Sequence, residues 1–420
     1  MTRIGERLAP ARLGTPFRWL LASTWISNLG DGFALSAGPL LIASQTQDAR
    51  LVALATLLQY LPWLLFGLVA GALADRLNRR LIVVTVDLLR AAVLGLLAAS
   101  IVVGSVNIAL VLVVLFVLGT AEVFGNSASA TLLPMLVPRH ELAIGNARLQ
   151  TGYVTLNQLV GPPLGAAMFA AGMSMAFVGQ AVLVAVGAVL ILRVTLPKDA
   201  GPPAPSKHVR ADIAEGFRWV VHHAAVRTLV LTILIFNVTF GAAWSVLVLY
   251  AKERLGMGAI GFGLLTTAAA VGGVIGTTTY GWIIKRVKLS DLMRIGLIIE
   301  TLTHLSLALT RSPTLATAIF VLFGAHAFIW GTTSVTVRQR AVPTALQGRV
   351  WSVNSLGTYG GLVAGAALGG PIANHWGITA PFWFAFTGSG LFVILIWKQL
   401  RHIAHEDDDH QPVTPEPAVV

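Results

Sequence analysis

Twelve long apolar runs dominate the chain and limit what it can fold into. A helix needs about 17–25 mostly apolar residues to cross the hydrocarbon core of a bilayer, and each run is long enough. Because backbone N–H and C=O groups find no water in lipid, each run must be a helix. The runs lack the alternating polarity that is typical of outer-membrane strands. They cover residues 19–42, 51–74, 81–103, 106–130, 149–171, 174–196, 228–251, 259–284, 289–310, 313–337, 350–374 and 378–397.

The composition supports an all-α integral membrane protein. Of the 420 residues, 55% are hydrophobic and 11% are charged, whereas about 25% of the residues in a soluble domain are charged. The mean hydropathy is +0.77. The net charge of +11 is spread over short clusters between the apolar runs, so we expect no nucleic-acid partner. The chain has no cysteine, which excludes disulfides, thiolate metal sites and thiol catalysis.

The distribution of lysine and arginine predicts the orientation in the membrane. If both termini lie on one side, that side holds 24 of the 29 Lys and Arg residues, and Arg90 lies within a helix. Loops rich in positive charge stay in the cytoplasm. The first apolar run is long enough to span, so we expect a retained helix and not a cleaved signal peptide. We therefore expect a multi-pass protein of a bacterial plasma membrane, with both termini in the cytoplasm.

Composition shifts divide the chain into five segments. We expect a cytoplasmic N-terminus (1–18), a six-helix bundle (19–196), a cytoplasmic linker (197–227), a second six-helix bundle (228–400) and a disordered acidic tail (401–420). The linker begins with the Pro-rich sequence PKDAGPPAPSKH. Its second part places Ile213, Phe217 and Val220 on one helical face, as expected for a short helix at the membrane surface.

The two bundles look related by an internal repeat. Gly161 and Gly165 lie on a helix of the first bundle, and Gly361 and Gly365 lie on a helix about 200 residues later. The sequence GALADR at 71–76 has a weaker echo in GWIIKR at 281–286. Two six-helix repeats are typical of transporters. The repeat predicts two pseudo-symmetric bundles of six helices each.

The loop between the second and third predicted helices reads GALADRLNRR over residues 71–80. It resembles the signature loop of the major facilitator superfamily, which implies that superfamily's twelve-helix fold and a cytoplasmic gate. The gate residues that match the pattern are Gly71, Asp75, Arg76, Arg79 and Arg80.

In the superfamily this loop latches the two halves together when the carrier faces outward. The resemblance implies that Asp75 meets the start of helix eleven near Arg349, where a helix N-terminus favours a carboxylate. Asn78 stands where the pattern has Gly, and Asn tolerates a left-handed backbone that would preserve the turn. The arginines alone are equally compatible with the ordinary excess of positive charge in cytoplasmic loops.

Helix five contains the sequence GPPLG. Gly161, Pro162 and Gly165 resemble an element found in helix five of the superfamily's proton-coupled exporters, with Ala166 where a second Gly is usual. Proline kinks a helix and glycine allows close helix contact, so ordinary packing is an alternative for any single residue. The stretches LPMLVPRHELAIGNARLQTGYVTLNQLVGPPLG and VPTALQGRVWSVNSLGTYGGLVAGAALGG resemble the branch of enterobactin exporters and macrolide-efflux proteins, which also contains lysophospholipid flippases.

Glycines four residues apart lie on four predicted helices. This spacing lets helix backbones approach closely. In the superfamily, helices two and eleven, and helices five and eight, meet across the two halves. The resemblance therefore implies that these glycine faces form a sliding interface between the bundles. The residues are Gly67 and Gly71, Gly161 and Gly165, Gly272 and Gly276, and Gly357, Gly361, Gly365 and Gly369.

Acidic residues within the predicted helices are candidates for proton coupling, because a buried charge is costly in a membrane. The resemblance places helices one and four beside the central cavity, which ranks Asp31 first and Glu122 second. A carboxyl group in a poorly hydrated cavity can exchange a proton near neutral pH. Asp31 is alternatively a packing residue bonded to a neighbour such as Asn28. Glu122 is alternatively a structural partner of Arg90 or Arg148.

Two further polar pairs lie on helices that the resemblance places at the periphery. Asp87 and Arg90 are three residues apart and share a helix face, which favours a structural ion pair. Glu300 and His304 are one turn apart. We interpret them as a structural pair, with a proton relay as the alternative.

Polar and aromatic side chains on helices one, four, seven and ten are candidates for the substrate cavity. Indole rings bind planar, lipophilic or cationic molecules. A sugar-binding site would require more hydrogen-bonding side chains than these four helices contain. Trp25 and Trp330 are equally compatible with positions that face lipid or pack between helices. The candidates are Trp25, Asn28, Asn126, Asn237, Trp244, His326 and Trp330.

Together these patterns predict a secondary active transporter that exports amphipathic small molecules, such as drugs, antibiotics or siderophores, in exchange for protons. A flippase of lipids or lysophospholipids, or a uniporter, is the alternative with the same fold. A sensor would not need the loop, the Gly-Pro element and a buried acid. The chain has no phosphate-binding loop of the Walker type and no catalytic constellation, so we expect no ATP motor, no enzyme, no metal site and no cofactor. The expected partners are substrate, protons and membrane lipids, and we expect a monomer.

Overall fold

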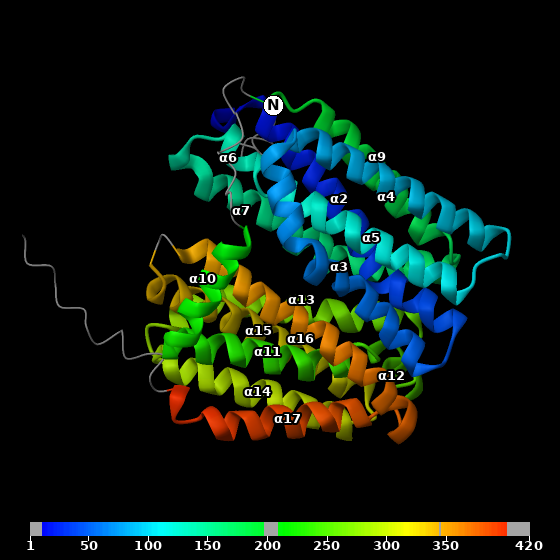
Figure 1. Cartoon of the computed structure of the whole chain (residues 1–420). Coiled ribbons are helices and arrows are strands. Elements are labelled where there is room, and N and C mark those ends of the chain that lie inside the picture. Colours follow the sequence, from blue (N-terminus) through cyan, green and yellow to red (C-terminus); the bar gives the residue numbers. More distant parts are fainter. Residues whose placement is uncertain (1–10, 197–208, 344–345, 401–420) are drawn as a thin grey trace, which may run out of the picture.

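The computed structural model describes residues 11–196, 209–343 and 346–400, and the regular elements in these ranges are helices (Figure 1). The first half contains η1 (Ala11–Leu13), α2 (Gly14–Gln45), α3 (Ala49–Arg76), α4 (Arg79–Val102), α5 (Ile108–Ser129), α6 (Leu132–Leu136), η2 (Arg139–Glu141), α7 (Leu142–Gly152), the π-helix η3 (Tyr153–Val160), α8 (Gly161–Ala171) and α9 (Met175–Leu192). The second half contains α10 (Val209–His222), α11 (Ala224–Trp244), α12 (Leu247–Glu253), α13 (Ala259–Ile283), α14 (Leu289–Leu309), α15 (Pro313–Ala341), α16 (Gln347–Trp376) and α17 (Ala380–Ile396).

Each predicted membrane span lies on helical structure. Within the described ranges, eight helices are long and apolar enough to cross a membrane, and α17 is a shorter apolar helix. Two predicted spans are interrupted: the span 149–171 is formed by α7, η3 and α8, and the span 228–251 by α11 and α12. The predicted class, an all-α membrane protein, is therefore confirmed.

Short polar side chains set where several helices begin. The Asp48 carboxylate accepts a hydrogen bond from the backbone N–H of Arg50 at 2.8 Å, and this caps α3. The side-chain oxygen of Asn78 accepts from the N–H of Leu81 at 3.3 Å and caps α4. Asn78 has an extended backbone with φ −66° and ψ 105°. The expected left-handed turn is therefore not used, because an N-cap side chain can reach the helix only from an extended backbone.

The helices form two bundles, one from each half of the chain (Figure 1). In the first, α2 packs against α8 and α9, and α4 packs against α5 and α9. In the second, α11 packs against α16 and α17, and α13 packs against α15. The bundles meet where α3 contacts α16 and where α8 contacts α13. The amphipathic helix α10 packs against the start of α16, where Glu215 forms a 2.9 Å ion pair with Arg349.

The glycine faces of helices five, eight and eleven hold helices together within each bundle. A methyl group on Gly165 would lie 2.6 Å from the Cα of Phe33 in α2. A methyl group on Gly361 would lie 2.6 Å from the carbonyl oxygen of Leu234 in α11, and Gly272 faces the backbone of α15 in the same way. For helices five, eight and eleven, the expectation that these faces form the sliding interface is therefore wrong, whereas a methyl group on Gly67 or Gly71 of helix two would meet no heavy atom within 4 Å. A glycine face marks where two backbones come closest, and here those contacts are made by neighbours in one bundle.

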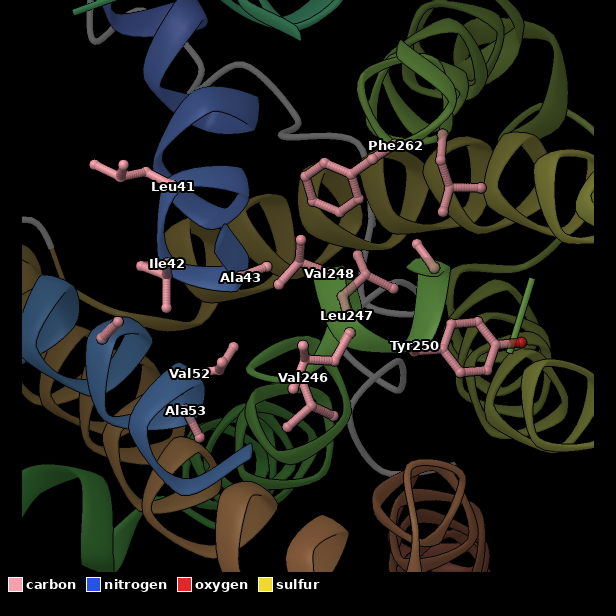
Figure 2. Close-up of a cluster of buried hydrophobic side chains, with 14 of the residues drawn as sticks. Leu41, Ile42, Ala43, Val52, Ala53, Val246, Leu247, Val248, Tyr250 and Phe262 are labelled. Atoms are coloured by element: carbon pink, nitrogen blue, oxygen red, sulfur yellow. The ribbon is translucent and has the colours of Figure 1, made fainter. Parts of the chain in front are cut away.

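The two bundles close against each other on the side where α2 ends and α3 begins, which we call the far side. Figure 2 shows the apolar side chains that meet there, from α2 and α3 of the first bundle and from α12, α13 and the residue before α12 in the second. Their packing excludes solvent: Leu41 is 1% exposed, Val52 is 2% exposed and Val246 is 0% exposed. We call this group the far-side closure; its labelled members are Leu41, Ile42, Ala43, Val52, Ala53, Val246, Leu247, Val248, Tyr250 and Phe262.

The end of α16 completes the contact on the far side. Gly370 lies so close to α3 that a methyl group on it would be 2.8 Å from both the Cα of Arg50 and the Cβ of Ala53. One turn later, the side-chain oxygen of Asn374 accepts two hydrogen bonds from the Arg50 guanidinium, at 2.7 and 3.2 Å, in the amide orientation that satisfies both groups. Close packing and one polar contact therefore join the two bundles here.

Candidate substrate and proton-coupling site

Arg90 of α4 is the centre of a charged cluster inside the first bundle. Its guanidinium forms ion pairs with Asp31 of α2 and, at 3.3 Å, with Asp87. The side chains of Arg90 and Asp87 are 11% and 10% exposed, and that of Asp31 is 30% exposed. Gln180 of α9 also donates to Asp31 at 3.4 Å. The predicted Asp87–Arg90 pair is confirmed, and the leading candidate, Asp31, shares the same arginine.

Glu122 of α5 is the third acid near Arg90. Its carboxylate interacts electrostatically with Arg90 and Asp31 and accepts a hydrogen bond from the side chain of Asn126. Asn126 is exposed on α5. Arg90 is one of the two structural partners considered for Glu122. We call Asp31, Asp87, Arg90 and Glu122 the carboxylate cluster.

The carboxylate cluster contains three acids and one permanently charged base. If all three acids were ionised, the cluster would carry two uncompensated negative charges inside the bundle. Buried charges without partners are strongly unfavourable. The cluster is electrically neutral when two of its three carboxyl groups hold protons. The arrangement can therefore bind and release protons.

The helix-five element packs directly beside Asp31. Gly32, the next residue, approaches η3 and α8 so closely that a methyl group on it would lie 2.8 Å from the Cα of Gly161. Pro162 removes a backbone donor, and its own carbonyl accepts a 2.7 Å hydrogen bond from the Ser36 hydroxyl of α2. The preceding segment is a π-helix, a form that occurs frequently at functional sites. Gly165, one turn further along α8, comes equally close to the backbone of Phe33.

Tyrosine side chains from three different helices lie near Glu122. Tyr60 of α3, Tyr153 of η3 and Tyr359 of α16 all interact electrostatically with its carboxylate. Trp63 of α3 stacks on Tyr359 with ring centroids 4.9 Å apart, so the aromatic group joins the two bundles. Three of the five tyrosines in the chain gather here. None of the three is among the cavity residues predicted from the sequence, because those candidates came only from helices one, four, seven and ten.

The two candidates on helix one make contacts within the first bundle. Trp25 donates from Nε1 to the backbone carbonyl of Arg148 at 3.0 Å, and its ring fills the space beside Gly152. The backbone carbonyl of Asn28 accepts a 3.3 Å hydrogen bond from the Asn157 side chain. Both residues therefore link α2 to helix five.

The candidates on helix seven are engaged within the second bundle. Trp244 stacks on Phe240 and Phe320, with ring centroids 4.3 and 5.1 Å apart. The Asn237 side chain donates to the carbonyl of Ile233 in its own helix at 2.7 Å. The candidates on helix ten, His326 and Trp330, lie on α15, which packs against α14.

The arginines of the signature loop tie the loop to the first bundle. Arg79 donates from Nε to the carbonyl of Ala74 at 3.1 Å, and Arg80 donates to the carbonyl of Val194 at 2.9 Å. Both contacts fix the turn between α3 and α4 against neighbouring segments.

The gate residue Gly71, near the end of α3, lies in an uncrowded region. A methyl group on Gly71 would meet no heavy atom within 4 Å, and the same holds for Gly67. Trp351, near the start of α16, is 56% exposed. The side chains of Asp75 and Arg76 lie outside the described residues, so the latch stays a prediction.

Comparisons with known proteins agree with this architecture. A family model described as transmembrane secretion effector, of the major facilitator type, matches residues 6–420. The chain is 29% identical over 384 residues to the multidrug efflux pump Tap of Mycolicibacterium fortuitum, which covers 87% of this chain and 91% of that protein. It is 25% identical over 406 residues to the enterobactin exporter EntS of Escherichia coli (strain K12), with 92% of each chain covered.

Solved structures of transporters share the fold. A bacterial homologue of the iron transporter ferroportin in its inward-facing state superposes with a TM-score of 0.72 at 17% identity, covering 92% of this chain and 98% of that chain. The outward-facing state of a bacterial ferroportin homologue gives a TM-score of 0.62 at 17% identity, covering 92% and 99%.

Proposed function

The chain belongs to the transmembrane secretion effector family of the major facilitator superfamily, and we propose that it exports amphipathic small molecules in exchange for protons. The family assignment makes it a transporter with small-molecule substrates. The names of two relatives, a multidrug efflux pump and an enterobactin exporter, support export as the direction. The observation that carries proton coupling is the carboxylate cluster, in which Asp31 and Asp87 pair with Arg90 and Glu122 interacts electrostatically with it.

The excess of three acids over one arginine favours the exchange of protons by the carboxylate cluster during transport. Asp31 is the most exposed of the acids that pair with Arg90, so it has the readiest access to water and substrate. Glu122 is the second carrier, because it lies among the aromatic side chains. A proton gained or lost at either acid changes the charge that must be buried when the carrier changes state. This links protonation to the equilibrium between the two facing states.

The aromatic group around Glu122 provides a surface for an amphipathic substrate. The rings of Tyr60, Trp63, Tyr153 and Tyr359 offer large apolar faces, and the hydroxyl groups offer hydrogen bonds. Because Trp63 and Tyr359 belong to different bundles, a substrate bound against this stacked pair would contact both halves of the carrier. We propose this group, with Glu122 and Asn126, as the substrate site.

The distribution of positive charge supports a cytoplasmic location for the N-terminal side. With that orientation the far side is the outer face, and its closure supports an inward-facing state, in which an exporter takes up its substrate. We propose that the bundles also close on the cytoplasmic side during the cycle, with Asp75 meeting the start of α16. Gly67 and Gly71 then provide the space for that approach.

Transport by purified carrier in proteoliposomes tests the proposal. With an imposed pH gradient, lumenal pH is followed while dyes, macrolides, catecholate siderophores and lysophospholipids are added one at a time. We expect a substrate-triggered proton flux that is lost in Asp31→Asn and reduced in Glu122→Gln. Asp291→Asn is the matched control, because Asp291 is 51% exposed and forms only a pair with Arg294 on its own helix.

Two results would contradict the proposal in different ways. Substrate movement without any proton flux would indicate a uniporter, or a flippase if lysophospholipid is the molecule moved. A proton flux that survives in Asp31→Asn at the wild-type rate would remove Asp31 from the coupling mechanism and leave Glu122 as the candidate.

A further inference from the structure

The second bundle contains buried ionisable side chains that the proposed export mechanism does not use. His304 of α14 is 0% exposed, and His326 of α15 is 5% exposed. The two imidazoles interact electrostatically, so they lie close together where α14 packs against α15. None of their four ring nitrogens has a hydrogen-bond partner among the described residues.

Glu300 belongs to the same group. It lies four residues before His304 on α14, and side chains at this spacing are neighbours on one helix face. The exposed residues Ile295, Ile298 and Leu302 occupy the opposite face of the helix. Glu300 therefore faces the helix interface and not lipid. Among the residues that the structure describes, none forms an ion pair with it.

Because α14 and α15 pack antiparallel, side chains of α15 lie on either side of Glu300 along the helix axis. Gly296, one turn before it, faces Trp330: a methyl group on Gly296 would lie 2.8 Å from Cδ1 of the indole ring. His326, one turn before Trp330 on α15, meets His304. Glu300 therefore lies between the indole of Trp330, one helical turn before it, and the imidazoles of His304 and His326, one turn after it. The indole Nε1 is also buried without a described partner.

Such a concentration of unpartnered polar atoms indicates bound water. Buried polar groups in proteins nearly always have a hydrogen-bond partner, and internal water supplies it where protein groups do not. We propose that Glu300, His304 and His326 form a hydrated proton-binding site within the second bundle. The site binds water molecules and one exchangeable proton.

The proton has two places within the site. It resides on a carboxyl oxygen of Glu300, or it passes through water to an imidazole nitrogen. The transfer breaks an O–H bond and forms an N–H bond, and it leaves a carboxylate beside an imidazolium. The total charge of the site is zero in both forms, so the bundle holds the proton without an uncompensated charge.

Other ionisable groups near the site are engaged elsewhere or lie at helix ends. Tyr250 of α12 donates its hydroxyl to a carbonyl of α14 at 2.6 Å, and the Tyr280 hydroxyl of α13 accepts from α15 at 3.4 Å. Asp291 and Arg294, at the start of α14, pair with each other at 3.3 Å. Helix α17, which also packs against α14, has no ionisable residue. The remaining cations on the neighbouring helices α11 and α15 lie near helix ends: Arg227, Arg338 and Arg340.

Infrared difference spectroscopy of the purified full-length carrier tests this site without requiring transport. Spectra recorded between acidic and alkaline buffers contain the carbonyl stretch of each carboxylic acid that loses its proton. We expect one such band to be absent in Glu300→Gln and to shift in frequency when the wild-type protein is transferred to D2O. In His304→Gln and His326→Gln we expect the pH midpoint of this band to move by about one unit or more, because a neighbouring charge changes.

Thr301→Val is the matched control. Thr301 is the next residue on α14, is buried, and uses its hydroxyl to bond the Leu297 carbonyl at 2.9 Å, so the variant removes a buried polar group without touching the site. We expect its band and midpoint to equal those of the wild type.

Three outcomes would overturn the proposal. The first is a spectrum of Glu300→Gln that equals the wild-type spectrum. The second is a Glu300 band at the frequency of a carboxyl group without hydrogen bonds, since the site would then be dry. The third is a midpoint unaffected by either histidine variant. Because the two histidines lie on different helices, one variant still decides the question if the other does not fold. A negative result in the infrared experiment would not contradict the export proposal. The absence of proton-coupled export in proteoliposomes would likewise not contradict the proposed proton-binding site.

Discussion

Replacing Gly370 with alanine should open the far-side closure. Gly370 lies on α16 of the second bundle, and the new methyl group would sit 2.8 Å from the Cα of Arg50, 2.8 Å from the Cβ of Ala53 and 2.9 Å from the carbonyl oxygen of Ala49, all in α3 of the first bundle. Two of these three atoms belong to the backbone, and the third is a Cβ, so none can move aside by a rotamer change. The bundles must separate by several tenths of an ångström, or the closed state must carry the strain.

The size of the effect follows from the cost of overpacking. An extra methyl group in a packed interior costs about 1–3 kcal/mol. If one or two kcal/mol of this cost remains after the neighbouring atoms relax, the equilibrium ratio changes by a factor of about 5–30. Because the strain exists only while the far side is closed, we expect the open population to rise by about that factor.

A thiol-labelling experiment measures this population. The chain has no cysteine, so a single Val246→Cys substitution introduces one thiol without background. Val246 is 0% exposed within the closure, and a maleimide reagent reaches it only when the far side opens (Figure 2). In detergent solution, Gly370→Ala in this background should label about 5–30 times faster than the background alone. Gly360→Ala is the control on the same helix, because its methyl group would meet only the Leu64 Cδ1 atom, at 4.0 Å.

Equal labelling rates with and without Gly370→Ala would refute the reasoning. It would mean that the far side relaxes around the methyl group at no cost. An equal acceleration in Gly360→Ala would also refute it, because that change adds no clash and would indicate a general loosening of α16.

Two further substitutions probe the first bundle through stability. Arg90→Met should lower stability by about 3–5 kcal/mol at neutral pH, because removing one partner leaves buried carboxylates unpaired. The loss should shrink in acidic buffer, where protonated carboxyls carry no charge, and thermal unfolding followed by tryptophan fluorescence across pH measures both effects. Gly32→Ala should lower the midpoint of thermal aggregation, since its methyl group would lie 2.7 Å from the carbonyl oxygen of Asn157. Gly38→Ala, on the same helix with no heavy atom within 4 Å, should instead raise the midpoint or leave it unchanged.

The positions of the helices were predictable, because hydropathy reports directly on what lipid requires of a backbone. The packing partners of those helices were not. A glycine face such as Gly361 and Gly365 predicts that the backbone of another helix packs closely against it. The sequence of that face does not identify which helix this is, and the structure shows that it is α11. The interruption of helix five at η3 was also not visible, since its residues are as apolar as those of an unbroken span.

The candidate site shows the same limit at the level of single residues. The spacing of Asp87 and Arg90 revealed their pair, because three residues along a helix is a local distance. The pairing of Arg90 with Asp31, 59 residues away, depends on how α2 and α4 pack. The gathering of Tyr60 and Tyr359 around Glu122 likewise brings together three helices. The sequence did contain a usable signal. Tyrosine carries a polar hydroxyl on an aromatic ring and is unusual in the middle of an apolar run, so each such tyrosine is a candidate for the cavity.

An apolar contact surface also responds to temperature. The far-side closure consists mainly of Leu, Ile, Val and Ala side chains, with one polar contact between Arg50 and Asn374. When such a surface opens into water, the attraction lost is largely hydrophobic, and that attraction weakens on cooling. Cold should therefore favour the open far side, and warmth should hold it shut. The resting orientation of this carrier would then follow the temperature at which the cell grows.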